Sequence, residues 1–166
     1  MSKYLSIAVS AALISVSSLS YAQDAAYAVP DGYSAKVVED IFKKGGIYWS
    51  AQTGAVPVTG QIYLDYENLG EAKNFGLPIS PATDVPGGTM QAFQTATLFH
   101  KNGQPAAFEV HGAILTKFLA LGGVAKWGFP VSNECDVKKG NVVLGKSGEF
   151  EQCTIYWSAA TGAHEI

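Results

Sequence analysis

Apolar and aromatic positions recur in three similar blocks along the chain. In each block a phenylalanine is followed five residues later by an aliphatic residue, an aromatic ring and a second large ring. The blocks are Phe42 with Ile47-Tyr48-Trp49, Phe93 with Leu98-Phe99-His100, and Phe150 with Ile155-Tyr156-Trp157. Residues that favour extended backbone dominate each block, and turn-forming residues follow it. The pattern predicts three β-hairpins.

A different apolar spacing follows the first two predicted hairpins. Apolar residues recur four and then three positions apart, as Ile62, Tyr66 and Leu69 and again as Ile114, Phe118 and Leu121. This spacing places one apolar stripe on a short helix of about ten residues. Gly70 and Gly122 directly follow the stripes, where a left-handed helix cap is expected. Helices this short must pack on the hairpins to be stable.

The loop after each predicted helix is also repeated. Phe75-Gly76-Leu77-Pro78 recurs 52 positions later as Trp127-Gly128-Phe129-Pro130. Each unit is therefore a hairpin, a short helix and a glycine–proline loop, which indicates an α+β, β-rich repeat protein. The third aromatic block is displaced further along the chain than this register predicts, so the second unit contains additional residues between Pro130 and Phe150.

These motifs resemble the LGFP repeat family of exported bacterial proteins associated with cell envelopes. The resemblance covers roughly residues 40–166 and rests on several motifs in register. They are Gly112-Ala113-Ile114, Leu121-Gly122-Gly123, Trp127-Gly128-Phe129-Pro130-Val131-Ser132-Asn133-Glu134, Ile155-Tyr156-Trp157-Ser158 and Thr161-Gly162-Ala163-His164. The resemblance implies a propeller-like arrangement with an incomplete ring. It also implies a non-catalytic module that recognises a cell-wall or envelope polysaccharide.

The N-terminal residues have the features of a secretory signal peptide. Lys3 precedes an apolar stretch that is too short to span a bilayer comfortably, and small residues at Ser20 and Ala22 suit signal peptidase. We therefore expect a signal peptide at 1–22, an arm or linker at 23–39, and one repeat domain at 40–166 with two full repeats and a final hairpin. The mature protein is then expected to be secreted or periplasmic, and associated with the cell wall.

Composition narrows the range of partners. The formal net charge is −3, and all 11 basic residues are lysines. Without arginine the chain lacks the bidentate donor favoured for phosphates and guanines, and its negative charge opposes approach to polyanions. We therefore expect neither nucleic acid nor an anionic membrane as a partner.

Two cysteines, Cys135 and Cys153, flank most of the additional segment of the second unit. Exported proteins usually have their cysteines paired, so we expect a disulfide between them. Cys153 also occupies the position of Gly45 and Ala96 in the other units, where a small residue is required. A reactive thiol or a metal ligand is the alternative.

The aromatic blocks provide the candidate binding residues. Adjacent residues of a strand face opposite sides, so the two rings of each block cannot both point inward. One set of rings is then exposed at repeated positions, where it could stack on sugars or contact a partner. The favoured set is Trp49, His100 and Trp157, because a histidine is tolerated better at a surface than in a core. Further ligand-binding candidates are Tyr48, Tyr156 and His164.

We find no catalytic or cofactor-binding motif in the sequence, and we expect neither enzyme activity nor a cofactor. Glu149 and Glu151 flank Phe150 and could form an acid–base pair, but alternation with a buried Phe150 makes them surface carboxylates. The three histidines, His100, His111 and His164, lack the spacing of zinc ligands, so we predict no metal site.

Two other hypotheses concern partners. An exported inhibitor, effector or assembly factor could present the same aromatic surface to a protein. The chain also begins and ends partway through a repeat, which would expose apolar surface at its ends. A homodimer would cover these ends.

Overall fold

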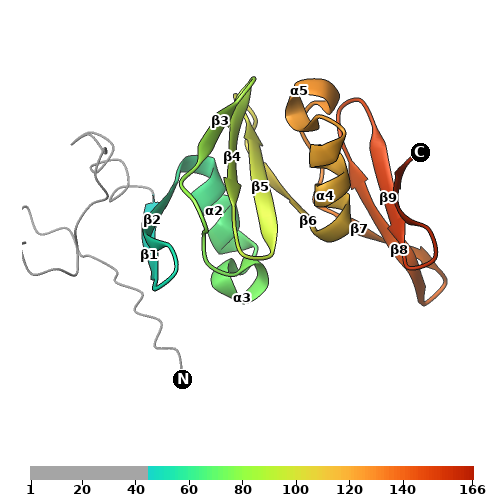
Figure 1. Cartoon of the computed structure of the whole chain (residues 1–166), viewed down its shortest axis with the longest axis horizontal. Coiled ribbons are helices and arrows are strands. Elements are labelled where there is room, and N and C mark those ends of the chain that lie inside the picture. Colours follow the sequence, from blue (N-terminus) through green and yellow to red (C-terminus); the bar gives the residue numbers. More distant parts are fainter. Residues whose placement is uncertain (1–44) are drawn as a thin grey trace, which may run out of the picture.

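The computed structural model describes residues 45–166 (Figure 1). The expected signal peptide, the arm at 23–39 and the first residues of the repeat domain, including Phe42, lie outside the described residues. Within the described residues, no helix is both long and apolar enough to cross a bilayer.

The first unit is a hairpin followed by two short helices. Strands β1 (Gly45–Ser50) and β2 (Gly54–Thr59) are antiparallel, and helices α2 (Gly60–Asn68) and α3 (Glu71–Phe75) follow. The predicted hairpin and the predicted helix are both confirmed, since Ile62 and Tyr66 of the apolar stripe are buried.

The second unit contains a four-stranded antiparallel sheet. Its strands are β3 (Thr83–Val85), β4 (Gly88–Ala92), β5 (Ala96–Lys101) and β6 (Ala107–His111), in the order β3-β4-β5-β6. The pair β5–β6 is the predicted second hairpin. The sequence pattern did not predict β3 and β4, because these short strands are rich in threonine, glycine and polar residues.

Two helices follow this sheet, α4 (Gly112–Ala120) and α5 (Gly123–Trp127). Helix α4 is the predicted second helix and buries the expected Ile114 and Phe118. As expected, Gly122 after the stripe has a left-handed conformation, with φ of 112°. The short helix α5, like α3, occupies part of the segment expected to be loop.

The third unit is a second four-stranded sheet, in the order β10-β9-β8-β7. Its strands are β7 (Cys135–Lys139), β8 (Val142–Glu149), β9 (Thr154–Ser158) and β10 (Gly162–Glu165). The pair β9–β10 is the predicted third hairpin. The additional residues of the second unit lie in β7 and β8, which confirms the position inferred from the repeat register.

The units form successive layers along the longest axis of the molecule, a hairpin, a helix, a sheet, a helix and a sheet (Figure 1). Helix α2 contacts β1 and β2 on one side and β5 and β6 on the other, and α4 lies between β5–β6 and β9–β10 in the same way. The described layers follow one another in a row. A propeller-like ring is therefore not confirmed.

The same aromatic stack fills the core between layers. Tyr66 of α2 stacks on Phe93 with ring centroids 4.5 Å apart, and Phe118 of α4 stacks on Phe150 at 4.1 Å. The buried residues form two apolar clusters, one on each helix. The first contains Val58, Ile62, Tyr66, Phe75, Phe93, Ala96, Leu98 and Ala107, and the second Phe99, Val110, Ile114, Phe118, Phe129, Phe150 and Ile155.

The predicted disulfide is wrong: Cys135 and Cys153 are both free thiols. Cys135 pairs with Ser147 on one side of β8, whereas Cys153 lies on the other side of β8 and accepts a hydrogen bond from Phe150. The two are thus two strand spacings apart and offset by three residues, about 14 Å in total. This is far beyond the Cα separation of about 6 Å that a disulfide requires.

Candidate functional site

The orientation of each ring in the aromatic blocks depends on the layers beside it. In β5, Leu98 belongs to the first apolar cluster and Phe99 to the second, so both faces of this strand are covered by a helix. Tyr48 has the orientation of Phe99, since it meets Tyr66 of the following helix edge-on at 5.3 Å. Burial raises the pKa of the Tyr48 hydroxyl well above its usual value.

Trp49 and His100 have the opposite orientation from Tyr48 and Phe99. Trp49 is 69% exposed, because the described residues place no layer before β1–β2. His100 is half-buried, and its Nε2 lies 3.0 Å from the Gln104 carbonyl oxygen. These two rings lie in different layers, so they do not form a continuous platform.

The rings of the third unit are both half-buried, and their orientation follows the same rule. Trp157 faces α4 and packs partly against the second apolar cluster. Tyr156 faces outward, where its ring meets His164 edge-on at 5.6 Å and its hydroxyl donates to the Leu144 carbonyl at 3.3 Å. Sequence alternation therefore predicts that neighbouring rings face opposite sides, but the flanking layers decide which ring is exposed.

The outer face of the last sheet is polar where the equivalent face of the preceding sheet is apolar. In the preceding sheet, the equivalent cross-strand row consists of Met90, Phe99 and Phe108. In the last sheet, this row consists of Ser147, Tyr156 and His164. Met90 and Phe99 of the earlier set pack in the cluster around α4, whereas no described helix covers the later set. This replacement is typical of a capping repeat.

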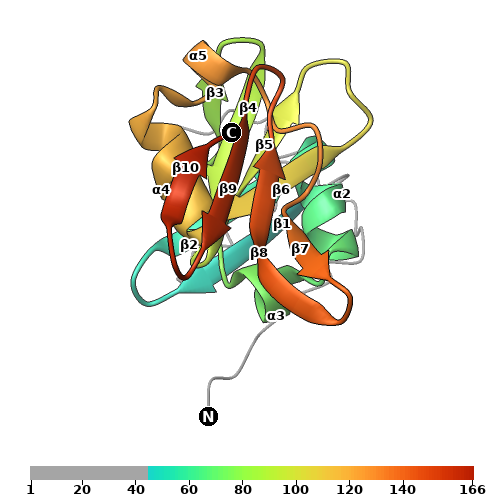
Figure 2. The same cartoon turned by 90° about the vertical axis from the view of Figure 1, so that its right-hand side faces the viewer.

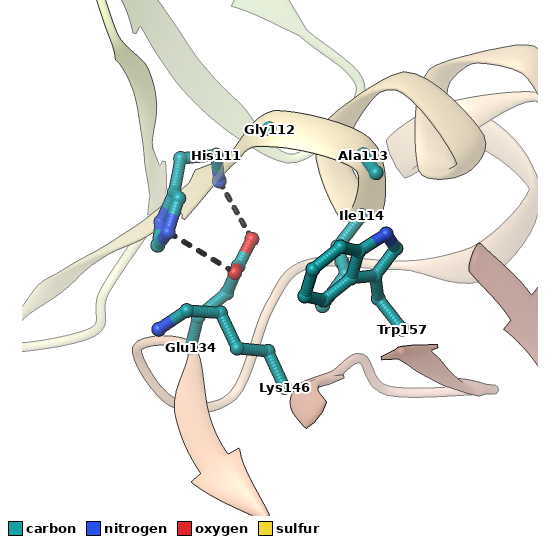
Figure 3. A pocket seen from close by; sticks show the side chains of 7 residues that line it. All are labelled: His111, Gly112, Ala113, Ile114, Glu134, Lys146 and Trp157. Atoms are coloured by element: carbon teal, nitrogen blue, oxygen red, sulfur yellow. Dashed lines mark hydrogen bonds and ion pairs between the residues drawn. The ribbon is translucent and has the colours of Figure 1, made fainter. Parts of the chain in front are cut away.

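Trp157 forms one wall of a pocket of about 240 Å³ between the second and third units. The other lining residues are His111, Gly112, Ala113, Ile114, Glu134 and Lys146. Figure 3 shows the indole beside the first turn of α4, with Glu134 and the Lys146 side chain on the side of His111. An aromatic wall thus stands close to both carboxylate and amino groups.

The junction between β6 and α4 positions the pocket residues 111–114. His111 ends the strand in an extended conformation, and Gly112 begins the helix with φ of 56°. This left-handed conformation turns the chain abruptly and is readily adopted by glycine. Thr59 and Gly60 form the same junction before α2.

His111 lies between two carboxylates. Its Nδ1 is 2.8 Å from Glu109 Oε2, and its Nε2 is 3.4 Å from Glu134 Oε2. The hydrogen bond to Glu109 is the main reason that the pKa of His111 is raised, although burial acts in the opposite direction. Protonated His111 can therefore pair with both carboxylates and offsets one of their two negative charges.

Glu134 is the most deeply buried charged side chain of the pocket, with 1% of its side chain exposed. Burial raises its pKa, while the hydrogen bond that it accepts from the His111 backbone N–H, at 2.7 Å, opposes this shift. That bond also satisfies an outward-pointing donor of β6, the edge strand of its sheet. Asn133 accepts from the Glu109 N–H of the same edge at 2.9 Å.

Lys146 provides a positive charge on the same side of the pocket as Glu134 and His111. It lies opposite Trp157 in the β8–β9 register, and its Nζ donates to Asp136 Oδ1 at 3.0 Å. This hydrogen bond raises the pKa of Lys146 and lowers that of Asp136. The ammonium group is thereby held beside the pocket rather than free in solution.

Three segments of the chain, residues 19–73, 75–125 and 128–166, match the family model of the LGFP repeat. The chain belongs to the LGFP repeat family. The second LGFP match contains the sheet β3–β6 and helix α4, so one repeat in this structure is a sheet followed by a helix. No curated protein matches the sequence.

The pocket lies at the boundary between two LGFP repeats. His111 and the first turn of α4 come from the second matched segment, and Glu134, Lys146 and Trp157 come from the third. A second pocket of about 210 Å³, lined by Phe99, Lys101 and Phe129 among others, lies at the same boundary. Contacts between the second and third repeats therefore create both of these pockets.

The residues considered for catalysis or metal binding in the sequence are spread over this LGFP module. Glu149 is exposed, whereas Glu151 pairs with Lys101 and accepts the Phe129 N–H at 3.1 Å, which fastens the glycine–proline loop. The predicted binding residues His100 and His164 lie in different sheets. In the described part of the chain, no group of three or more histidine, cysteine or acidic side chains is arranged to hold a metal ion.

Sequence reasoning missed the pocket residues Glu134 and Lys146, and also Glu109, which contacts His111 from outside the pocket lining. Glu134 lies in the LGFP motif itself, directly after Asn133, and this was the only signal that pointed to it. Glu109 lies two residues before His111 on β6, whereas only the packing of two repeats brings Glu134 and Lys146 to the pocket.

Proposed function

We propose that this LGFP protein is an exported, non-catalytic module that binds a polysaccharide of the cell wall or envelope. The binding site is the pocket between the second and third repeats. The observation that carries the proposal is that Trp157, its cross-strand partner Lys146, and Glu134 line one pocket.

The chemistry of this pocket suits a sugar. A sugar ring has an apolar face of C–H groups that packs on an indole, and a rim of hydroxyl groups that donate to carboxylates and accept from ammonium groups. Lys146 supplies a donor on the side of the pocket away from the indole, next to His111 and the Glu134 carboxylate that His111 engages. The volume of about 240 Å³ is below that of pockets for drug-sized ligands, which favours one sugar residue of a longer chain.

Export and attachment to the envelope are supported by the N-terminal residues 1–22 and by membership of the LGFP family. The low fraction of charged residues, 15%, also suits contact with a largely neutral polymer. The predicted binding residues Trp49 and His100 line neither the Trp157 pocket nor the second pocket, so we assign them no primary role.

Co-sedimentation with insoluble wall polysaccharide tests the proposal. The protein should sediment with the polymer, and Trp157→Ala should abolish this while the matched variant Trp49→Ala retains it. Circular dichroism of both variants checks that they are folded. Binding that survives glycosidase treatment of the wall material but not protease treatment would instead identify a protein partner.

A further inference from the structure

The hairpin β7–β8 is longer than its counterpart in the preceding repeat. Strand β7 has five residues against three in β3, and β8 has eight against five in β4. The extension ends in a two-residue turn in which Gly140 has φ of 61° and the flanking Lys139 and Val142 are paired. Figures 1 and 2 both place this turn at the outer end of the last sheet.

The extended tip exposes three consecutive apolar side chains. Val142, Val143 and Leu144 are 62%, 51% and 48% exposed. In the shorter hairpin of the preceding repeat, Val85 at the corresponding turn packs partly against the second apolar cluster. The apolar tip is thus a feature of the extension and does not contribute to the described core.

Lysines surround these apolar residues on both faces of the hairpin. Cross-strand pairs share a face, and the register pairs Lys139 with Val142 and Lys138 with Val143. Asp136 lies within ion-pair distance of both Lys138 and Lys146, at 3.4 and 3.0 Å. Lys139 has no ion-pair partner among residues 45–166.

We propose that this hairpin tip inserts into the interfacial region of a bilayer that contains anionic phospholipids. Val142 and Val143 lie on opposite faces of the hairpin, so a protein that covered one face would leave the other in water. A lipid layer surrounds the tip and removes both side chains from water at once. The lysines behind the tip would then reach the phosphate groups while their alkyl chains stay in the interface.

From the negative net charge of the whole chain we expected no anionic membrane partner. That total does not show how the charges are distributed, and the hairpin tip is locally rich in lysine. Residues 138–146 contain three lysines and no acidic residue. Electrostatic attraction to a surface is limited to about a Debye length, so the charges near the contact matter more than the total. The inference does not rest on the proposed sugar site, since the tip residues Val142 and Val143 do not line that pocket.

Vesicle co-sedimentation of the exported protein, residues 23–166 after removal of the expected signal peptide, tests the inference. The probes are phosphatidylcholine vesicles with and without phosphatidylglycerol. We expect binding only with phosphatidylglycerol, weakened about 25-fold in Lys138→Gln/Lys139→Gln, from about fivefold per lysine. Val142→Ser/Val143→Ser should weaken it about tenfold or more. Because the same N-terminal residues are present throughout, the differences report on the hairpin.

Matched variants elsewhere provide the controls. Ile79→Ser removes another exposed apolar side chain, and Lys73→Gln/Lys117→Gln removes two other surface lysines, so both should bind vesicles as the unaltered protein does. Absence of binding to phosphatidylglycerol vesicles would overturn the proposal. So would a valine variant that binds normally, since lysines alone would then attract the surface. A lipid-free dimer abolished by Val142→Ser/Val143→Ser would assign the tip to self-association instead.

Discussion

Trp157 on β9 lies directly opposite Lys146 on β8, and both side chains line the pocket at the start of α4. The relationship depends on the register of two strands in one repeat, whereas His111 on the other side of the pocket comes from the preceding repeat. Ligand binding at this position would therefore report on the packing of two repeats as well as on the side chains themselves.

The pair of carboxylates around His111 predicts a pH-dependent stability. Because the folded state raises the pKa of His111, this group contributes its full stability below about pH 6.5, and the contribution is lost as pH rises through the folded pKa. The pKa of Glu134 is also raised, so its ionised form destabilises the folded state. Ionisation of Glu134 therefore also lowers the stability as pH rises. The free energy of unfolding should therefore fall between about pH 6 and 8.

Urea denaturation at a series of pH values measures this dependence, with His111→Gln as the comparison. The variant should show a flatter profile through the same range, because glutamine does not titrate. An unchanged slope in His111→Gln would mean that other groups cause the pH dependence.

The hydroxyl group of buried Tyr66 should stabilise the first repeat boundary. It donates to the Gly76 carbonyl oxygen at 2.7 Å, so Tyr66→Phe leaves that carbonyl without this donor. The expected loss is about 1–2 kcal/mol in the free energy of unfolding. Tyr63→Phe, which removes an exposed hydroxyl from the same helix, should change stability by less than about 0.5 kcal/mol. Equal effects would contradict the assigned role of the Tyr66 bond.

Two glycines with positive φ should differ in their tolerance of a side chain. A Cβ at Gly112 meets open space, so Gly112→Ala should cost only the backbone strain, about 1–2 kcal/mol. At Gly128 the backbone is at φ 73° and ψ −171°, and a Cβ would lie 2.7 Å from the Glu151 Cβ. Gly128→Ala should therefore cost more than Gly112→Ala in chemical denaturation. The reverse order would show that Glu151 moves aside freely.

The free cysteines predict two different reactivities. Cys135 is exposed and should react rapidly with a thiol reagent, whereas burial raises the pKa of Cys153 and should slow its reaction. Both thiols should be titrated in the folded protein without prior reduction. Finding fewer than two thiols before reduction and two after it would restore the disulfide that the sequence suggested.

Strand alternation predicted the hairpins and the opposite orientation of neighbouring rings, because both depend on local backbone geometry. It could not predict that Trp49 is exposed while Trp157 is partly packed, since this depends on whether a helix lies before the strand. The disulfide failed for a similar reason. Cys135 and Cys153 bracket one segment in the sequence, but β8 separates them in the sheet.

The pocket itself was beyond sequence reasoning for a further physical reason. His111 and Glu134 are 23 positions apart and meet because Glu134 accepts the backbone N–H of His111 at the open edge of β6. The unpaired N–H groups of an edge strand need acceptors from elsewhere in the fold, and a periodic sequence pattern does not show which residues supply them. The motif that contains Glu134 was identified in the sequence, but the hydrogen bond that Glu134 accepts from His111 was not predicted.

The three indole N–H signals in a two-dimensional NMR spectrum provide the most direct test of the proposed sugar site. They belong to Trp49, Trp127 and Trp157, which lie in distinct surroundings, and tryptophan substitutions assign them. On titration with soluble wall polysaccharide fragments, the Trp157 signal should shift and saturate while those of Trp49 and Trp127 remain in place. Saturable binding of the fragments with an unmoved Trp157 signal would contradict the account.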